Sequence, residues 1–489
     1  MLFNSYIYIF LFFPVVAAVY FALNRMRLVL AAKAWLVLAS LFFYSYWNPV
    51  YLPIILGSML VNYGIGTALS RAAEKGAGRL TVSPQGLLLF GILLNLGLLG
   101  YYKYADFFIA NLNWAGAGLP LLHLVLPLAI SFFTFQQIAY LVDSYRNETR
   151  EYDFLNYCLF VSFFPQLIAG PIVHHREMMP QFASLRNSLV NYRNIAVGLM
   201  IFSLGLFKKV GIADSFAVWA TAGFDQAPVL NLVEAWAASM SYTLQLYFDF
   251  SGYTDMAIGS ALLFNIRLPL NFNSPYKAVN IQDFWRRWHM TLSRWLRDYL
   301  YIPLGGSKHG ETRTYVNLFL TFLLGGLWHG AGWTFVLWGG MHGIGTSVHR
   351  FWQSMGLKMP RWLGWSVTFL FVHCAWVFFR ATTFDDAMKV FRGMVGLTGV
   401  MLPEKLQGSL ATLAPAGVTF GKYLENIGGS DHTVFMVLIF ALVAFLGPNS
   451  MELKERFRPS FRYMILVAAV LIAGLLNLTK MAEFLYFNF

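Results

Sequence analysis

The sequence has few charged residues, few cysteines and no internal repeat. Of its 489 residues, 12% are charged and only two are cysteines. Average soluble domains contain about twice that charged fraction, which argues against a soluble globular chain. Cys158 and Cys374 lie inside apolar runs, so they provide neither a disulfide framework nor the paired Cys/His spacing of a metal site. The absence of a repeat weakens the case for a secondary transporter.

Apolar and aromatic residues dominate what is present. Hydrophobic residues make up 58% of the chain, with 46 Phe, 25 Tyr and 15 Trp. A spanning helix needs about 20 mostly apolar residues, and these runs are continuous, unlike the alternating segments of a membrane β-barrel. We therefore expect one all-α, polytopic membrane domain over residues 1–489. The net charge of +12 fits basic cytoplasmic loops, so we expect a lipid bilayer and no nucleic acid as partner.

Basic clusters between the apolar runs divide this domain into four parts. We expect N-terminal spans (1–153), a core (154–380), an external segment (381–431), and C-terminal spans with an aromatic tail (432–489). The first apolar run lacks a basic leader and a cleavage site, so it is expected to stay as a span. Basic loops on the cytoplasmic side place both termini outside, and residues 121–142 form the fifth span. At about 20 residues per crossing, we predict about twelve crossings with two or three partial insertions.

Two stretches of the core depart from simple crossings. Residues 154–173 are interrupted by Pro165 and Gly170-Pro171, which favours a segment that enters and leaves on one face. Residues 232–266 are predicted to form two apolar segments joined around Phe250-Ser251-Gly252.

Residues 283–300 are predicted to form an amphipathic helix lying in the membrane interface. At about 100° per residue, one face is aromatic and the opposite face is basic. The aromatic face contains Trp285, Trp288, Leu292, Trp295, Leu296 and Tyr299, and the basic face contains Arg286, Arg287, Arg294 and Arg297. His289 lies at the edge of the aromatic face. The arginines fit either lipid headgroups or the phosphates of a cytoplasmic ligand.

Two histidines lie in the apolar run 319–350. His329 and His342 are surrounded by glycines, and the pattern predicts a helical hairpin opening to the cytoplasm, broken near Gly330–Gly332. Ionisable groups at membrane depth are costly and usually face a cavity or a partner, so each is a functional candidate. Imidazole exchanges protons near neutral pH. The alternative for each is a histidine hydrogen-bonded inside the bundle.

Carboxylates and a terminal tyrosine complete the candidates. Asp249 and Asp255 lie in an apolar region, where they would orient a histidine, pair with an arginine, or form buried pairs that hold the bundle. Asp298 is open to the same roles. Tyr486 lies in a short tail after the last span; the tail either anchors at the interface or folds back into a central cavity from outside, since six or seven residues reach about 20 Å. A phenol ester is reactive enough to hold an acyl group and pass it on.

Four stretches together resemble the membrane-bound O-acyltransferase (MBOAT) superfamily, in its bacterial AlgI/DltB-like branch and nearest to the AlgI-like alginate O-acetylation proteins. They are Gln245–Tyr253, Asp283–His289, Trp295–Tyr301 and Gly325–Gly330. The resemblance covers nearly the whole chain and implies a ring of about twelve helices, with re-entrant and interfacial helices, around a thin floor crossed by a tunnel. It implies His329 as the catalytic histidine, His289 as the second motif histidine, and Tyr486 as acyl carrier. Supporting or tunnel residues would be Gln245, Tyr247, Asp249, Asp255, Trp285, Arg286, Arg287, Asp298, Trp328 and His342.

The resemblance also implies a function. We expect an O-acyltransferase of the bacterial inner membrane that takes an acetyl group from a cytoplasmic donor, acetyl-CoA, with no bound cofactor or metal. The acetyl group would cross the membrane for O-acetylation of an exopolysaccharide such as alginate. A periplasmic SGNH-type O-acetyltransferase or related accessory protein would complete the transfer to the polysaccharide acceptor. The alternative is a polysaccharide or lipid transporter without acyl chemistry.

Overall fold

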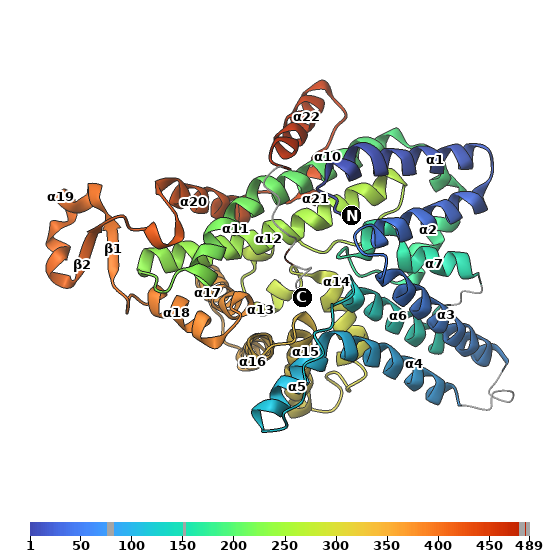
Figure 1. Cartoon of the computed structure of the whole chain (residues 1–489), viewed down its shortest axis with the longest axis horizontal. Helices are drawn as coiled ribbons and strands as arrows, with labels where there is room; N and C mark the ends of the chain where they lie inside the picture. Colours follow the sequence, from blue (N-terminus) through green and yellow to red (C-terminus); the bar gives the residue numbers. More distant parts are fainter. Residues whose placement is uncertain (76–82, 150–152, 479–484, 486–489) are drawn as a thin grey trace.

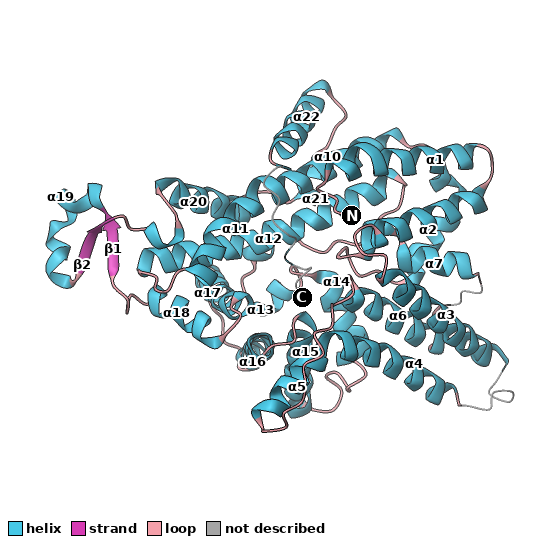
Figure 2. Cartoon of the chain, viewed as in Figure 1, coloured by secondary structure: helices cyan, strands magenta, loops and turns pink. Residues whose placement is uncertain are grey.

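The structure is a computed structural model that describes residues 1–75, 83–149, 153–478 and Leu485. It is built almost entirely of helices, with one small sheet at its edge (Figures 1 and 2). The helices are α1 (Phe13–Arg25), α2 (Val29–Ser45), α3 (Tyr51–Lys75), α4 (Pro84–Leu99), α5 (Ala105–Trp114), α6 (Ile130–Tyr145), α7 (Phe154–Ser162), α8 (Phe164–Leu167), α9 (His175–Ala183), α10 (Tyr192–Leu206), α11 (Asp214–Thr221), α12 (Leu232–Leu263), α13 (Ile281–Trp285), α14 (Met290–Leu296), α15 (Glu311–His329), α16 (Trp333–Ser354), α17 (Arg361–Arg380), α18 (Phe384–Met394), α19 (Gln407–Leu410), α20 (Asp431–Leu446), α21 (Ser450–Arg456) and α22 (Phe461–Leu476). Turns of π-helix lie at Tyr8–Phe12, Gly100–Tyr104, Phe207–Ala213, Ala222–Gln226 and Arg297–Tyr301, and 3-10 turns at Leu185–Ser188, Pro275–Lys277, Glu404–Leu406, Ala411–Ala416 and Glu425–Ile427.

Several helices are long and apolar enough to cross a membrane. Within the described residues, five helical stretches meet this requirement: Tyr8–Arg25, Tyr51–Ala72, Pro84–Trp114, Tyr192–Gln226 and Arg361–Arg380. A sixth would be α20 with α21, which are bent by 60° at a short break, and α2 and α22 are shorter apolar helices. The polytopic helical architecture is confirmed, while the ring of about twelve crossings stays a prediction.

The central helix α12 is one continuous helix of 32 residues, so the predicted division at Phe250-Ser251-Gly252 is wrong. The stretch contains no proline, and Gly252 serves a contact with α10. A Cβ atom on Gly252 would lie 2.8 Å from the carbonyl oxygen of Gly205, and one on Gly259 would lie 2.6 Å from that of Gly198. Each glycine pair is seven residues from the next, which keeps both on the shared face. The two helices therefore pack with their backbones in contact (Figure 1).

The predicted continuous helix over 283–300 is also wrong. Helices α13 and α14 are separated by a break at 286–289, where His289 has a left-handed backbone with φ 42°. The cause lies outside the segment, because the Asn271 carbonyl accepts a hydrogen bond from Met290 N at 2.9 Å. The tryptophans of this region are buried in protein, with Trp288 1% exposed. The aromatic face thus packs against the bundle and does not lie in the interface plane.

The predictions for two other regions, 154–173 and 121–142, agree with the structure to different degrees. The 154–173 segment is broken as predicted, into α7, α8 and a non-helical stretch. In contrast, the expected 121–142 span is helical only from Ile130 onward. Two features set the late start: Pro127 disfavours helical backbone at residue 126, and Ala129, directly before Ile130, has a left-handed backbone with φ 60°.

The hairpin of α15 and α16 forms as predicted, with the break between His329 and Trp333. Gly326 on α15 and Gly339 on α16 face each other at the crossing, where a Cβ atom on Gly326 would lie 2.8 Å from Gly339 Cα. This close approach fixes the end of α15 against α16.

Residues 381–431 carry α18 and the only described strands, β1 (Val400–Pro403) and β2 (Val418–Gly421). The strands are parallel, with Val400 opposite Val418 and Pro403 opposite Gly421. Together with α19 they project from the helical body at one edge (Figure 2).

We expect Gly339→Ala to destabilise the protein by about 1–3 kcal/mol, since the added methyl overlaps the Phe322 carbonyl oxygen. Gly340→Ala is the matched control, because its nearest neighbour would lie 3.8 Å away. The midpoint of thermal unfolding in detergent distinguishes the two. Equal midpoints would contradict the tight crossing.

Candidate active site

His329 is the last residue of α15 and is buried among aromatic rings. Its side chain is 3% exposed. The ring centroids of Trp328, Trp338 and Phe379 lie 5.0, 5.2 and 5.2 Å from that of His329. This aromatic wall, contributed by α15, α16 and α17, keeps bulk water from the imidazole.

His289 is brought to the same place from the break between α13 and α14. Its ring centroid lies 6.4 Å from that of His329, and it is fully buried. His289 Nδ1 lies 3.0 Å from Asn271 Oδ1. An amide oxygen only accepts, so Nδ1 carries the proton and Nε2 carries the lone pair. Asn271 thus sets both the backbone conformation and the tautomer of the second histidine.

Asn271 was missed by sequence reasoning, and so was Trp338. Asn271 Oδ1 also accepts from Thr291 Oγ1 at 2.9 Å, which ties the loop to α14. Asn271 carries no local signal, because it precedes His289 by 18 residues in an irregular loop. Trp338 had a weak signal, as the aromatic residue midway along the hairpin arm that carries His342.

His342 lies apart from the histidine pair. Its Nδ1 accepts a hydrogen bond from Trp285 Nε1 at 3.2 Å, and Trp338 lies between it and His329, with a ring centroid 4.7 Å from that of His342. His342 therefore links α16 to α13 through this hydrogen bond. Trp328, by contrast, lies beside both histidines, 6.4 Å from His289 by ring centroids.

The predicted carboxylates pair with lysines, so of the three alternatives for Asp249 and Asp255 the buried pair that holds the bundle is the one observed, and neither carboxylate pairs with an arginine. Lys209 Nζ lies 2.5 Å from Asp249 Oδ1, and Lys208 Nζ lies 2.7 Å from Asp255 Oδ2. The two lysines come from the π-helical turn after α10, which faces α12. Since these pairs are buried, they join α10 to α12 at membrane depth.

The remaining predicted residues surround these groups. Gln245 and Tyr247 are buried on α12, and Tyr247 packs against Tyr276 with ring centroids 5.4 Å apart. Asp298 is bound by its neighbour Arg297 at 2.6 Å and contacts neither histidine. Tyr486 lies outside the described residues. Its neighbour Leu485 is described, and the Leu485 amide donates to Asp249 Oδ2 at 3.2 Å.

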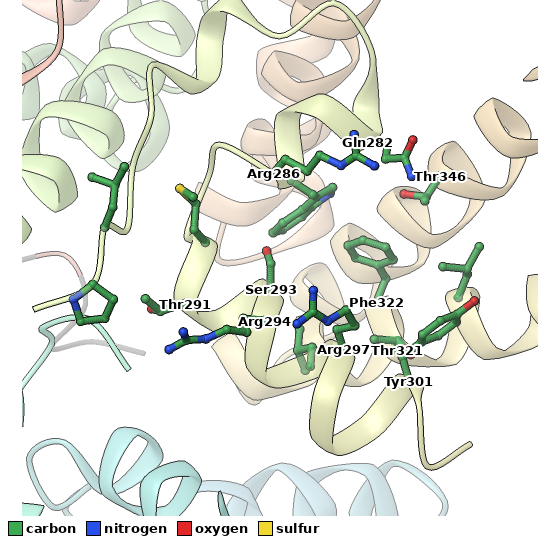
Figure 3. Close-up of a pocket in the computed structure, with 16 residues that line it drawn as sticks. Gln282, Arg286, Thr291, Ser293, Arg294, Arg297, Tyr301, Thr321, Phe322 and Thr346 are labelled. Carbon is green, nitrogen blue, oxygen red and sulfur yellow. The ribbon is translucent and has the colours of Figure 1, made fainter. Parts of the chain in front are cut away.

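A cavity of about 660 Å³ opens beside α13 and α14, with three arginines in its wall (Figure 3). Arg286 lies on one side of it, with Arg294 and Arg297 on the other. Arg287 is not part of the wall; its Nε binds Asp283 at 2.8 Å. Met290 and Thr291, which follow His289 directly, also line this cavity. A cavity of this size with guanidinium groups suits a ligand with several phosphates.

A second cavity, of about 310 Å³, adjoins the chain just after the end of α15. Its wall includes Gly330 and Ala331, which follow the histidine directly, together with Lys103 and Asp106. The arginine-lined cavity contains none of these residues. Neither histidine lines either cavity itself, but residues that directly follow His289 in the sequence line the first cavity and residues that directly follow His329 line the second.

Comparison with known proteins identifies the family of the chain. Residues 142–384 match the model of the membrane-bound O-acyltransferase family. The chain is 48% identical to a peptidoglycan O-acetyltransferase of Helicobacter pylori, over 100% of this chain and 98% of the relative. It is 40% identical to a probable alginate O-acetylase AlgI of Pseudomonas aeruginosa, over 84% of this chain and 78% of the relative. A teichoic acid D-alanyltransferase of Streptococcus thermophilus is 28% identical, over 46% of this chain and 57% of the relative.

The chain belongs to the membrane-bound O-acyltransferase family. It is a membrane-embedded acyltransferase, and its relatives include both AlgI-like O-acetylases and D-alanyltransferases.

We expect His329→Ala to lower the rate of acyl transfer by about 10²–10⁴-fold, the contribution of a general base. His342→Asn is the matched control on the same hairpin, because asparagine keeps an acceptor for Trp285 Nε1. It should retain at least about a tenth of the rate per folded molecule. The comparison uses the rate of acyl transfer in detergent, normalised to the amount of monodisperse protein. A rate for His329→Ala equal to that of the parent would exclude His329 as the general base.

Proposed function

We propose that the protein takes an acetyl group from acetyl-CoA on the cytoplasmic side of the bacterial inner membrane and passes it outward for O-acetylation of a glycan. One observation supports this most directly: two buried histidines have ring centroids 6.4 Å apart, and the residues that directly follow each of them line a different cavity, one of which is basic. A donor held on one side and an acceptor on the other would then share one imidazole.

The basic cavity suits coenzyme A. Arg294 and Arg297 in its wall are paired with Glu177 and Asp298, so Arg286 is the arginine that we assign to the phosphates of that donor. The apolar wall, including Trp285 and Phe322, suits the pantetheine arm. The cavity also borders Met290 and Thr291, next to His289. Bound phosphates in the cavity therefore leave the thioester within reach of the histidines, which favours this ligand over lipid headgroups for Arg286.

The aromatic tail is proposed as the acceptor of the first transfer. Leu485 is bound to Asp249, and the next residue of α12, Phe250, packs on His289 with ring centroids 4.8 Å apart. Leu485, the residue before Tyr486, is thus bound to the α12 residue that directly precedes Phe250, whose ring packs on His289. Lys209 neutralises Asp249, so that its second oxygen remains an acceptor for the tail amide.

The first transfer then follows by general base catalysis. His329 takes the phenolic proton of Tyr486, and the phenolate oxygen attacks the thioester carbonyl carbon. The coenzyme A thiolate leaves and recovers the proton from the imidazolium, which gives free thiol and an acetylated tyrosine. A second transfer, with a periplasmic SGNH-type O-acetyltransferase or related accessory protein as partner, moves the acetyl group to a hydroxyl of the glycan.

The relatives suggest which glycan to test first. The relative matched along its whole length is named a peptidoglycan O-acetyltransferase, and the one matched over 84% of this chain is a probable alginate O-acetylase. We therefore place peptidoglycan before alginate as the final acceptor.

The relay predicts an acetylated tail. Incubating the purified protein with acetyl-CoA should add about 42 Da to the C-terminal peptide, the mass of an acetyl group replacing a proton. Tyr486→Phe should abolish the added mass while acetyl-CoA still binds. An unmodified tail under saturating donor, with flux of intact polysaccharide or lipid across proteoliposomes, would instead favour transport.

The hydrogen bond between Asp249 and the Leu485 amide can be tested with two substitutions and the same mass measurement of the C-terminal peptide. Asp249→Asn should slow tail acetylation at least about tenfold, because the tail amide loses a charged acceptor. Asp214→Asn removes the other carboxylate of the same lysine, 2.8 Å from Lys209 Nζ, without touching the tail. Equal losses in the two variants would show that Asp249 acts only through Lys209.

The donor cavity yields a separate prediction. Arg286→Gln should raise the KM for acetyl-CoA about tenfold with little change in kcat, since one charge-assisted phosphate contact contributes about 1.5–3 kcal/mol. Arg287→Gln, at the next position but outside the cavity, should leave KM nearly unchanged. Steady-state kinetics in detergent test both. A lipid role for Arg286 would leave KM for acetyl-CoA unaffected.

A further inference from the structure

Three consecutive carbonyl groups at the end of α15 are bound by side chains of a distant segment. Tyr104 Oη donates to Leu327 O at 2.8 Å, and Lys103 Nζ donates to Trp328 O at 2.5 Å and to His329 O at 3.2 Å. The last four carbonyls of a helix have no partners within the helix. Here a π-helical turn, Gly100–Tyr104, supplies partners for the last three, ending at the histidine itself.

Lys103 Nζ forms these bonds without a carboxylate partner among the residues that the structure describes. Its Nζ also lies 3.2 Å from Ser131 Oγ and 5.8 Å from the centroid of the Trp328 ring. The negative end of the α15 dipole compensates the charge. A charged group at membrane depth is costly, so its presence beside the catalytic region requires an explanation.

The position of His329 explains why such a bond is useful. Helix ends fray, and the residue after His329 is a glycine, which imposes little restraint on the chain. The cavity of about 310 Å³ adjoins this end, so carbonyls released from Lys103 would have room to turn toward it. A rotated terminal turn would move the imidazole away from His289.

We propose that Lys103 is a positioning residue: its ammonium holds the Trp328 and His329 carbonyls and so keeps the His329 ring aligned with His289. This inference rests on the proposed role of His329 in acyl transfer. Lys103 exchanges no proton and forms no covalent bond in the reaction. Tyr104 holds the helix two residues earlier and does not bind the peptide group of the histidine.

The first test compares two substitutions in the same turn. Lys103→Met keeps an apolar side chain of similar length and should lower kcat about a hundredfold, the cost of a misplacement of about 1 Å. KM for acetyl-CoA should stay within about twofold, because Lys103 is not part of the arginine-lined cavity. Tyr104→Phe removes only the bond to Leu327 O and should retain at least about a third of kcat.

The second test separates charge from folding. In Lys103→Ala, propylammonium entering the adjacent cavity should restore kcat at least about tenfold, because it replaces the missing atoms. 1-Propanol, which has the same carbon chain without the charge, should not restore it. A parental kcat in Lys103→Met, equal losses in Lys103→Met and Tyr104→Phe, or equal rescue by 1-propanol would overturn the inference. Full activity of His329→Ala would overturn the proposed function instead.

Discussion

Every polar group buried at membrane depth in this protein has to find its partner inside the protein. Without water, an unpaired backbone or charged group costs several kcal/mol. The consequences are visible at each functional position: a left-handed residue bonded to a loop amide at His289, lysines paired with carboxylates between α10 and α12, and an ammonium that binds the carbonyl end of α15. These hydrogen bonds and ion pairs, more than the packing of apolar side chains, determine the arrangement of the site.

The parts of the fold that were predictable are those determined by local residue types. Glycines mark the turn between α15 and α16, and Pro165 marks the interruption after α7, because both act on the backbone where they stand. The motif residues around His329 and His289 likewise identified both histidines before the structure placed them together. The twelve-crossing ring, the catalytic roles of the site residues, the acetyl donor and the partner remain expectations.

The errors arose where the cause lies far along the chain. Gly252 looked like a break in α12, but its role depends on Gly205 of another helix. The segment after Trp285 looked like one helix, but a carbonyl of Asn271 ends it. Buried pairs were one of three alternatives for Asp249 and Asp255, and the sequence did not identify Lys208 and Lys209 as the partners, because only the packing of α10 on α12 brings these residues together. Local propensity cannot report such contacts.

The glycine contacts between α10 and α12 also restrict how the protein can move. With backbone touching backbone at two points seven residues apart, neither helix can slide along or roll over the other without a collision of main-chain atoms. Rocking of one half against the other, the usual motion of carriers that alternate between two openings, is closed to this pair. The proposed hand-over of a two-carbon group requires no such relative motion of α10 and α12, whereas the passage of a whole sugar chain would require a wide opening.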